Sequence, residues 1–481
     1  TKDKTTISYH SFRIPSIVRA KQSNVLIAIA EGRQCSSVDY GNINLVYKRS
    51  TNNGKTWSAM KDLVGVGDGT WGNPTPVVDE RGNGTIYLFV SWNSGKTAQY
   101  ANEYHPCTNE PLTTFDKGDR KVFLIKSIDH GVSWLPHVDM TSTLQPDDFK
   151  FDAMGPGNGI QLSYPPYSMV IPATNRNIFF ANGRWQYKMI PTGSSEGTIT
   201  ELSEGVLLRN DRVVKTLWLS NKSRFLSRGT LEGTFSSFQP HAGLVDPRCQ
   251  GSSMVYTLSN PHRLLFLNPA RTDKRCQFTI RVSYDDGITW PISRLLHDNM
   301  TAAQTCLWPR RGGYSSMAKT HDFHVGIMTE RNSTAGPSGR GYIEFHRVNL
   351  AWILNGATEP SNPPSPFTRA NSNGAAPANP APKPGSRATP GSTPSSPHAT
   401  ERGAPTTEPS SAEPNDSSTP SVVVASSSPS SSHQQPSVST PSTTSPAVMA
   451  PVFSAAATPH ASWCTTALAA IALLAVSLPL H

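Results

Sequence analysis

The residues of this chain that could best carry out chemistry are arginines, carboxylic acids and one tyrosine, each in a short motif. Arg13 lies in a Phe-Arg-Ile-Pro segment, Glu196 precedes Gly-Thr-Ile-Thr, and Tyr314 lies in Gly-Tyr-Ser-Ser. A guanidinium group binds a carboxylate through two parallel hydrogen bonds, and a tyrosine becomes a nucleophile when a neighbouring base accepts its proton. Taken singly, such residues are more often surface or packing residues, so their meaning depends on the fold that positions them.

Histidines and cysteines give little support for a metal site. His105 lies near Cys107, and His321 lies near His324, but neither pair has enough further ligands close by in the sequence. Protein zinc sites use three or four side-chain ligands. We therefore predict no bound metal and no cofactor.

The charge balance favours an anionic substrate. Lys and Arg number 43 against 34 Asp and Glu, a net charge of +9. Residues 357–481 hold four basic and five acidic residues, which leaves +10 on residues 1–356. No run of Lys or Arg occurs, so a nucleic-acid groove is not predicted. The composition also excludes a collagen, a coiled coil and a polytopic membrane protein.

Short apolar stretches separated by turn residues predict that residues 1–356 are all-β. No segment there has a convincing apolar stripe with the 3.6-residue period of a helix. The predicted strands include Val25–Ala30, Asn44–Lys48, Thr85–Ser91, Val122–Ser127, Met254–Leu258, Leu264–Asn268, Thr279–Ser283 and Tyr342–Val348.

One eight-residue motif of the form Ser-x-Asp/Asn-x-Gly-x-Ser/Thr-Trp occurs three times, ending at Trp57, Trp134 and Trp290. Its Asp or Asn caps backbone N–H groups of a turn, its Gly takes a positive φ, and its Trp packs on the sheet. The motif resembles the Asp box of β-propellers, which precedes the outermost strand of a blade. A degenerate copy ends at Trp185. At roughly 40–60 residues per blade, about 350 residues predict a six-bladed β-propeller.

The same region resembles the exo-α-sialidase (neuraminidase) family, because the family's motifs occur in order from Phe12 to Trp352. The matching segments are Phe12-Arg13-Ile14-Pro15, Glu31-Gly-Arg33 with Ser37-Val-Asp39, Gly155-Pro-Gly-Asn-Gly-Ile-Gln161, Glu196-Gly-Thr-Ile-Thr-Glu-Leu202 with Asn210-Asp-Arg212, Cys249-Gln-Gly-Ser252, Arg275 eight residues before Ser283, Gly313-Tyr314-Ser-Ser316 and Glu330.

The resemblance implies that three arginines from different blades bind the carboxylate on the anomeric carbon of a sialic acid. They are Arg13, Arg212 and Arg275, although Arg271 and Arg281 lie close to the last of them in the sequence. Arginine suits this task because its planar fork matches a carboxylate, which a lysine ammonium cannot do.

The resemblance also assigns the reacting groups. Tyr314 would be the nucleophile and Glu196 its base, since a neutral tyrosine is not repelled by the substrate carboxylate. Asp39 would protonate the leaving oxygen and later activate water, on a loop that can close over the substrate. Glu330 would orient the first of the three arginines, and Arg33 would contact the 4-position of the sugar.

These assignments predict a hydrolase that releases terminal sialic acid from glycoproteins, glycolipids and oligosaccharides with retention of configuration. A transferase that uses the same residues is an alternative, as is an inactive sialic-acid-binding adhesin. The adhesin ranks last, because Tyr314, Glu196 and Asp39 are all present. The predicted partners are sialylated glycans and, through the C-terminal segment, a membrane, with no nucleic acid.

Cysteines and glycosylation motifs favour an extracellular or lumenal location. Five of the six cysteines lie in residues 1–356, so at least one of these lacks a partner there. Four Asn-x-Ser/Thr motifs begin at Asn83, Asn221, Asn299 and Asn332, and they suit a secreted chain. The chain begins at Thr1, which suggests that a signal peptide has been removed.

The prolines mark a boundary near residue 356, since 22 of the 41 lie in residues 357–481. We predict a catalytic domain over residues 1–356 and a disordered Ser/Thr/Pro-rich stalk over 357–460, with a reach on the order of 50 Å. Residues 461–481 resemble a cleaved signal for a glycosylphosphatidylinositol (GPI) lipid anchor, because small residues at 454–456 precede a spacer and an apolar run to Leu480. The predicted location is the cell surface. A tail anchor, the lysosomal lumen and secretion are the alternatives.

Overall fold

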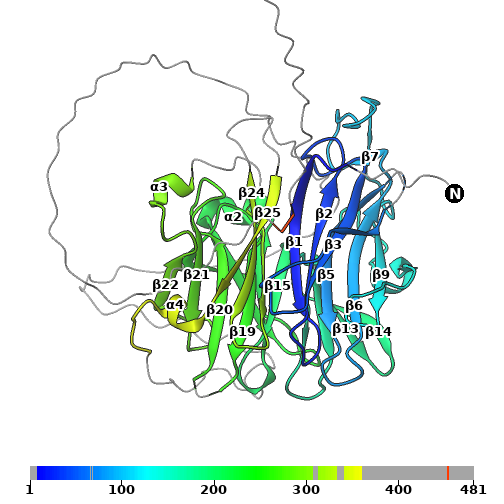
Figure 1. Ribbon diagram of the computed structural model, residues 1–481. Helices are drawn as coiled ribbons and strands as arrows, with labels where there is room; N and C mark the ends of the chain where they lie inside the picture. The colour runs from blue at the N-terminus through cyan, green and yellow to red at the C-terminus, as the bar shows by residue number, and fades with distance from the viewer. Residues whose placement is uncertain are drawn as a thin grey trace, which may run out of the picture.

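The computed structural model describes residues 8–65, 67, 69–259, 261–306, 313–332, 341–359 and 452–453. These residues form an all-β domain of antiparallel sheets that stand side by side (Figure 1). The predicted stalk and anchor segments lie outside the described residues, apart from residues 357–359 and the pair Val452 and Phe453. All eight strands named from the sequence are confirmed, with bounds shifted by a few residues.

The strands run in chain order through successive sheets. An eight-stranded sheet contains β1 (Ser11–Arg19), β2 (Leu26–Arg33), β3 (Ile43–Ser50), β4 (Lys61–Val64), β5 (Thr70–Val78), β6 (Ile86–Asn93), β9 (Lys121–Ser127) and β10 (Val138–Asp139). Three four-stranded sheets follow in chain order. The first is β11 (Ile160–Gln161), β12 (Met169–Ala173), β13 (Arg176–Ala181) and β14 (Arg184–Met189), and the second is β15 (Ser194–Glu201), β16 (Leu207–Val213), β17 (Ser223–Gly229) and β18 (Gln239–Val245). The third is β19 (Ser252–Thr257), β20 (Arg263–Pro269), β21 (Phe278–Ser283) and β22 (Ile292–Leu295). The last sheet is β23 (Ser315–Lys319), β24 (Val325–Asn332) and β25 (Gly341–Val348), and a small pair is β7 (Thr97–Ala98) with β8 (Thr113–Thr114).

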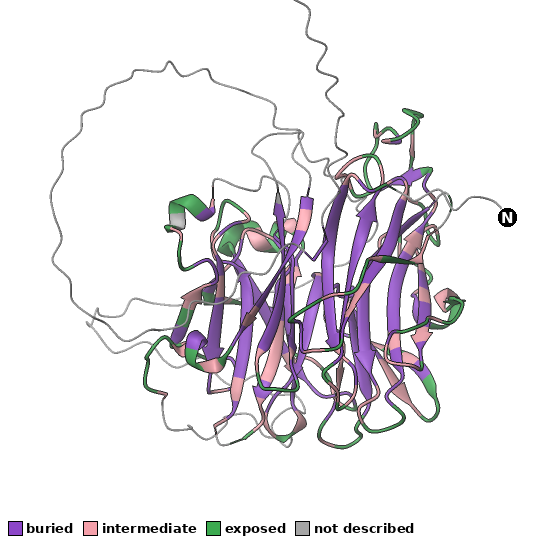
Figure 2. Cartoon of the chain, viewed as in Figure 1, coloured by how far each residue is buried: buried purple, intermediate pink, exposed green. Residues whose placement is uncertain are grey.

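One strand of each group lies on the inside of a ring: the first strand, or β12 in the β11–β14 sheet. β1 contacts β5, β5 contacts β12, β12 contacts β15, β15 contacts β19, β19 contacts β23, and β23 contacts β1 again. The arrangement is therefore propeller-like. Its strands are mostly buried, whereas exposed residues lie in the loops and short helices (Figure 2).

Both faces of the sheets are apolar, because each sheet packs between two others. In β2, Leu26 and Ala28 face the cluster shared with β23–β25, and Ile27 and Ile29 face the cluster shared with β5 and β6. Successive side chains of a strand point to opposite faces, so a continuous apolar run is required here. Similar clusters fill the spaces between the later sheets.

The three Asp boxes form the predicted turns, each directly before the last strand of its group. Ser50 Oγ accepts a hydrogen bond from the Gly54 N–H at 2.9 Å, and Asn52 Oδ1 accepts one from the Thr56 N–H at 2.9 Å. The copies at Asp129 and Asp285 repeat this pattern. Gly54 has a φ of 83°, which favours glycine at this position.

The degenerate copy at Trp185 lies at the corresponding place, between β13 and β14, but makes a different turn. Ala181 pairs with Arg184 across a two-residue loop, Asn182-Gly183, whose φ angles are 53° and 76°. Asn-Gly with two positive φ angles is the type I′ hairpin. Trp185 still packs on the sheet, against Phe89.

The helices in the described part of the chain are short. They are α1 (Thr141–Leu144), α2 (Lys215–Asn221), α3 (Ala302–Thr305), α4 (Leu350–Leu354) and a 3₁₀ turn, η1 (Ser203–Gly205). Among the described residues no helix has the length and apolar character needed to cross a bilayer.

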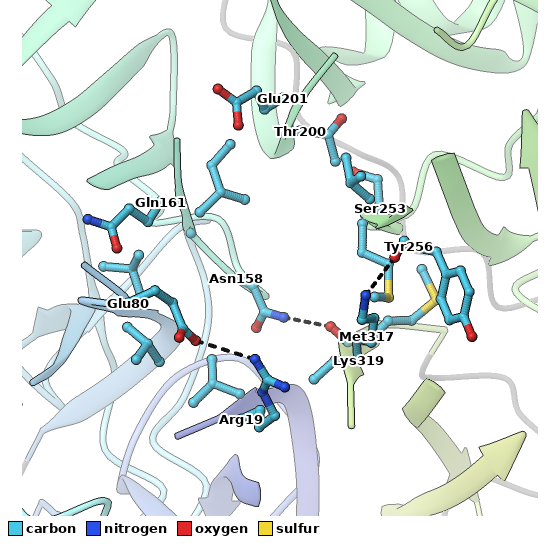
Figure 3. Close-up of a pocket in the computed structure, with 18 of the residues that line it drawn as sticks. Arg19, Glu80, Asn158, Gln161, Thr200, Glu201, Ser253, Tyr256, Met317 and Lys319 are labelled. Atoms are coloured by element: carbon cyan, nitrogen blue, oxygen red, sulfur yellow. Dashed lines mark hydrogen bonds and ion pairs between the residues drawn. The ribbon is translucent and has the colours of Figure 1, made fainter. Parts of the chain in front are cut away.

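A cavity of about 500 Å³ lies where the inner strands end (Figure 3). Arg19 and Glu80 form an ion pair at its wall, with Nη2 and Oε1 3.9 Å apart, and Lys319 Nζ donates to the Tyr256 carbonyl at 2.8 Å. Asn158 also lines it, with Nδ2 donating to the Met317 carbonyl at 2.8 Å.

Candidate active site

The predicted site residues gather at the opposite end of the inner strands from this cavity. On β1, Arg13 lies near the start and Arg19 at the end. The same separation holds on β15 between Glu196 and Glu201, a residue of the cavity wall. All eight predicted site residues lie in the described part of the chain.

A bulge in β1 positions Arg13. The register with β2 shifts between Arg13 and Ser16, where Ile14 has a φ of 54° and Pro15 has no N–H to donate. Bulges re-aim side chains beside active sites. The Phe-Arg-Ile-Pro segment therefore breaks the strand ladder locally, immediately after Arg13.

Arg13 is buried and contacts two carboxylates. Its Nη1 donates to Asp39 Oδ1 at 2.7 Å, its Nε donates to Glu330 Oε1 at 3.2 Å, and its guanidinium carbon lies 5.4 Å from the centre of the Tyr314 ring. Burial alone would lower the pKa of Arg13, but Glu330 and Asp39 outweigh it and raise that pKa above its usual value.

Glu330 bonds to the segments that carry Arg13 and Tyr314. Only 2% of it is exposed. Oε1 accepts the Ile14 N–H at 2.8 Å, and Oε2 accepts the Tyr314 N–H at 3.0 Å, so its two oxygens fix the backbone of both segments.

Asp39 lies between two arginines at the open side of the site. Arg33 Nη1 donates to Asp39 Oδ1 at 2.7 Å, matching the bond from Arg13, while 75% of the Asp39 side chain is solvent-exposed. The surrounding protein removes part of the hydration of the Asp39 carboxyl even though the side chain is largely exposed, which works to raise its pKa, but the Arg33 and Arg13 guanidinium groups outweigh this and hold that pKa below the ordinary range. Without a ligand, Asp39 is therefore ionised at neutral pH.

Glu196, Arg212 and Tyr314 form the second half of the site. Glu196 and Arg212 are directly opposite on β15 and β16, and Arg212 Nη1 donates to Glu196 Oε2 at 2.7 Å. The Tyr314 hydroxyl donates to Glu196 Oε1 and accepts from Arg212 Nη1 at 2.9 Å. Burial and the Glu196 carboxylate raise the pKa of Tyr314 well above its usual value, while Arg212 and Arg275 oppose that rise.

The structure separates the three neighbouring arginines of the third Asp-box region. The guanidinium carbon of Arg275 lies 5.8 Å from the centre of the Tyr314 ring. Arg271 pairs with Asp273 at the surface, and Arg281 donates to Asn268 Oδ1 at 2.9 Å. Arg275 is the one of the three that the structure brings to the site.

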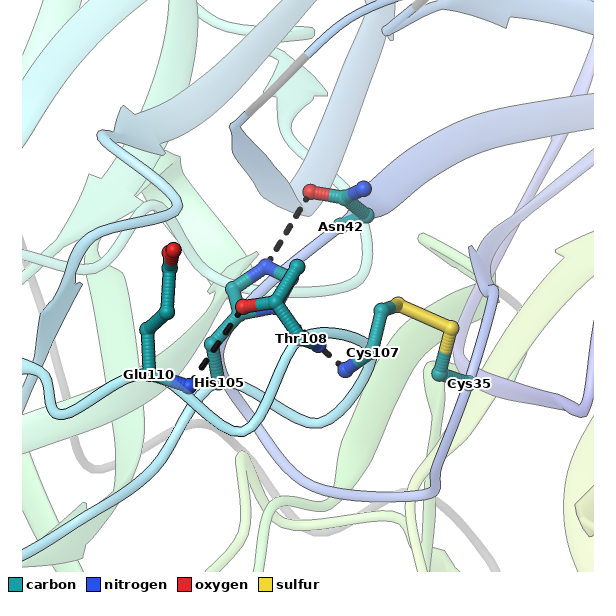
Figure 4. The surroundings of a disulfide bond; sticks show 6 residues. All are labelled: Cys35, Asn42, His105, Cys107, Thr108 and Glu110. Carbon is teal, nitrogen blue, oxygen red and sulfur yellow. Dashed lines mark hydrogen bonds between the residues drawn. A yellow bond between two sulfur atoms is a disulfide. The ribbon is translucent and has the colours of Figure 1, made fainter.

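The loop that carries Asp39 is tied to the segment between β6 and β9 (Figure 4). Cys35 forms a disulfide with Cys107, Tyr40 Oη bonds to Glu103, and His105 Nε2 lies 3.3 Å from Asn42 Oδ1. Closure over a substrate, as predicted from the sequence, would have to move both segments together.

Two residues of the quoted motifs support the site, although no role was assigned to them from the sequence. Glu31 Oε2 accepts from Arg33 Nη2 at 2.6 Å, and its Oε1 accepts the Asn73 N–H at 3.1 Å. Gln250 accepts the N–H of Ser315, directly after Tyr314, at 2.9 Å. Their place inside the motifs was the signal that marked them.

The cysteine prediction is confirmed for the described residues. Cys276 pairs with Cys306, and Cys249 is free and buried. Cys249 packs with Ile14 and Tyr314, and burial raises the pKa of its thiol to about 11, so the thiol stays protonated.

One group of possible metal ligands occurs among the described residues, away from the two pairs that were considered and set aside from the sequence. It comprises His297, Glu344 and His346. Arg331 Nη1 lies 3.1 Å from His297 Nε2 and so already supplies a cation there. Of the two pairs that were set aside, one contains Cys107, which forms a disulfide with Cys35.

Comparison with known proteins identifies relatives of this chain. Residues 14–206 match the family described as BNR repeat-like domain. A curated exo-alpha-sialidase of Aspergillus fumigatus is 41% identical over 371 residues, covering 74% of this chain and 88% of that protein. One of Arthroderma benhamiae is 42% identical over 366 residues, covering 73% and 86%.

Solved structures support the fold. The Hadza microbial sialidase Hz136 has a TM-score of 0.57 at 24% identity, covering 72% of this chain and 67% of that one. A leech intramolecular trans-sialidase has a TM-score of 0.58 at 16% identity, covering 73% and 70%. With identity above 40% over most of its described domain to two curated members, the chain belongs to the exo-α-sialidase family.

Proposed function

We propose that this protein is a retaining exo-α-sialidase that releases terminal sialic acid from glycoproteins, glycolipids and oligosaccharides. The observation that carries the proposal is the contact between the Tyr314 hydroxyl and Glu196, with Arg212 bonded to both. A buried phenol paired with a carboxylate base, and surrounded by arginines, suits attack on a carbon that carries a carboxylate.

Substrate binding would begin with the sialic acid carboxylate. Arg13, Arg212 and Arg275 all lie around the Tyr314 ring or hydroxyl, so a carboxylate bound by them would put its anomeric carbon near that oxygen. Arg33 remains fixed by Glu31, and we propose that it contacts the 4-position of the sugar.

Binding would also prepare the acid. Arg13 donates to Asp39 in the free protein, and a substrate carboxylate would compete for the same guanidinium group. Weakening that ion pair, and adding a negative charge nearby, raises the pKa of Asp39 toward protonation. The acid would therefore become competent in the substrate complex.

In the first step, the Tyr314 oxygen would bond to the anomeric carbon as the glycosidic C–O bond breaks. The phenol proton would pass to Glu196, and Asp39 would protonate the leaving oxygen. In the second step, Asp39 would take a proton from water, whose oxygen attacks the anomeric carbon. The Tyr314–carbon bond breaks, Glu196 returns its proton, and two inversions give net retention.

We also propose that the ring has six blades. The eight-stranded sheet consists of two meanders, β1–β4 and β5, β6, β9 and β10, joined by a single parallel pair, Ile43 with Thr70. With the four later sheets of three or four strands, this division gives six groups. The closed ring of inner-strand contacts supports it.

For location, we propose an extracellular surface enzyme held by the GPI-type anchor. Two disulfides and three exposed acceptor residues, Asn83, Asn221 and Asn299, favour an oxidising, glycosylating compartment. A phosphatidylinositol-specific phospholipase C should release sialidase activity from intact cells. Activity that stays with the cells, with residues 461–481 still attached, would favour a tail anchor instead.

The activity is tested by incubating the full chain with sialyllactose and following the products by NMR. The proposal expects free sialic acid that appears first as the α-anomer. If added isotope-labelled lactose receives most of the sugar and becomes labelled sialyllactose, the transferase alternative holds. Binding without turnover would support the adhesin alternative.

A further inference from the structure

We propose that Val452 and Phe453, far down the predicted stalk, form a latch that positions Arg13 and Glu330 in the active site. Along the chain, residues outside the described ranges separate these two from Glu359, yet they lie at the junction of β1 and β25 (Figure 1). The inference rests on the carboxylate-binding role proposed for Arg13.

The backbone of the latch extends the last sheet. Ile343 in β25 donates its N–H to the Phe453 carbonyl at 2.9 Å, and its carbonyl accepts the Val452 N–H at 2.9 Å. Ile343 therefore directs both backbone groups toward the latch and away from β24. Ile343 is paired with Glu330 of β24. Because the backbone groups of Ile343 point away from β24, this is a non-hydrogen-bonded pair, in which the two side chains lie close together.

The side chains of the latch are fully enclosed. Phe453 is 0% exposed and Val452 is 2% exposed, which is unusual within a Pro/Ser/Thr-rich segment. The Phe453 ring lies 5.7 Å from the ring of Phe12, with an angle of 35° between their planes. Both latch residues share one apolar cluster with Phe12 and Ile343.

Phe12 and Ile343, the two residues whose distances to the latch are given above, are each next to a residue of the site. Phe12 precedes Arg13 in the chain, and Ile343 lies opposite Glu330 in the sheet. Arg13 and Glu330 bond to each other, and Glu330 also holds the Ile14 N–H. The latch therefore packs against the neighbours of Arg13 and Glu330, whose bond orients the Arg13 guanidinium group.

Removing the Phe453 ring would leave a cavity that Phe12 and Ile343 relax into. Tightly packed interiors transmit such shifts, and a misplacement of about 1 Å in an active site can cost about a hundredfold in rate. The effect should appear in steps that use the carboxylate contact of Arg13.

The first test compares Phe453→Ala with Phe323→Ala in the full chain, using sialyllactose below the unfolding temperature of each variant. Phe323 is a matched control because it is 67% exposed and touches no proposed site residue in the described contacts. We expect kcat/KM to fall about 10- to 100-fold for Phe453→Ala and to stay within about twofold for the control. Phe453→Leu, which refills most of the space, should recover most of the loss. Wild-type kinetics in Phe453→Ala would overturn the proposal.

The second test separates positioning from stability. If the latch acts through Arg13, Phe453→Ala should cost little further activity in an Arg13→Lys background, because coupled residues are not additive. Losses that simply multiply would leave the latch a purely stabilising contact and overturn the proposal. If Arg13→Lys alone were harmless, the carboxylate role of Arg13 would fail instead, so the two failures are distinguishable.

The third test concerns the intervening chain. Replacing residues 365–445 with a Gly/Ser segment of equal length should leave kcat/KM unchanged, because the proposal needs the latch and not the sequence before it. A chain that stops after residue 450 should match Phe453→Ala. Full activity of the shortened chain would contradict the latch.

Discussion

Asp39→Ala probes the acid without removing the nucleophile or the arginines. The variant deletes a carboxylate that accepts hydrogen bonds from Arg13 and Arg33 at 2.7 Å each. Because 75% of that side chain is exposed, its ion pairs contribute little to folding, and the unfolding temperature should change by only a few degrees. A loss of activity is then attributable to chemistry.

The size of the loss follows from the bond that is broken. A positioned general acid contributes about 10²- to 10⁴-fold, or roughly 3–5 kcal/mol of transition-state stabilisation. A sugar alkoxide leaves poorly without a proton, so sialyllactose should show that full loss in kcat. An aryl sialoside releases a stable aryloxide and should lose about tenfold or less.

The assay measures kcat and KM for both substrates with the wild type, Asp39→Ala and Asp39→Asn. The Asn variant keeps an oxygen for Arg13 and Arg33 but has no proton to give, so it should match Ala on sialyllactose. Equal losses on the two substrates would refute the acid role of Asp39.

Three further predictions test other parts of the site. Tyr314→Phe removes the hydroxyl that contacts Glu196, so kcat should fall by about 10³-fold or more. A sialic acid analogue should still bind, as measured by calorimetry. Turnover near wild type would mean that another residue attacks the anomeric carbon. Arg13→Lys loses the planar fork and should weaken carboxylate binding by about 10- to 100-fold, whereas kinetics within twofold of wild type would exclude a carboxylate-binding role for Arg13. Burial works to raise the pKa of Glu344, but His297, His346 and Arg331 outweigh it and lower that pKa. Glu344 therefore stabilises the fold fully above its unfolded pKa of about 4.3, and this stability is lost as the pH falls from there toward the lower folded pKa. Glu344→Gln should flatten the decline of Tm between about pH 5 and 2, and an unchanged decline would argue against this role.

The sequence predicted the strands and Asp-box turns because their determinants are local. Asn52, Asp129 and Asp285 each bond to backbone only four residues away, so eight residues contain the whole turn. The degenerate copy at Trp185 does not form this turn, because it lacks these local determinants. Without its serine, Asn182-Gly183 makes a hairpin turn instead.

The contacts between distant segments could not be derived from the sequence. Five cysteines in the domain allow many pairings, and only the folded chain brings Cys35 to Cys107, 72 residues away. The resemblance favoured Arg275 over Arg271 and Arg281 by its distance from Ser283, but only the folded chain shows that Arg275 lies beside Tyr314. Such choices are made by tertiary packing, which leaves no short-range pattern.

The latch also changes what the anchor proposal implies for reach. The small residues at 454–456 follow Phe453 directly, and three residues span at most ~10 Å, against the ~50 Å expected of a free stalk. With the latch docked, a lipid attached there would hold the domain close to the outer leaflet. Fluorescence transfer from a labelled domain to a membrane dye should then decrease in Phe453→Ala, because the undocked chain adds length between the domain and the lipid. Equal transfer in the two proteins would mean that the docked pair does not set the height of the domain above the membrane.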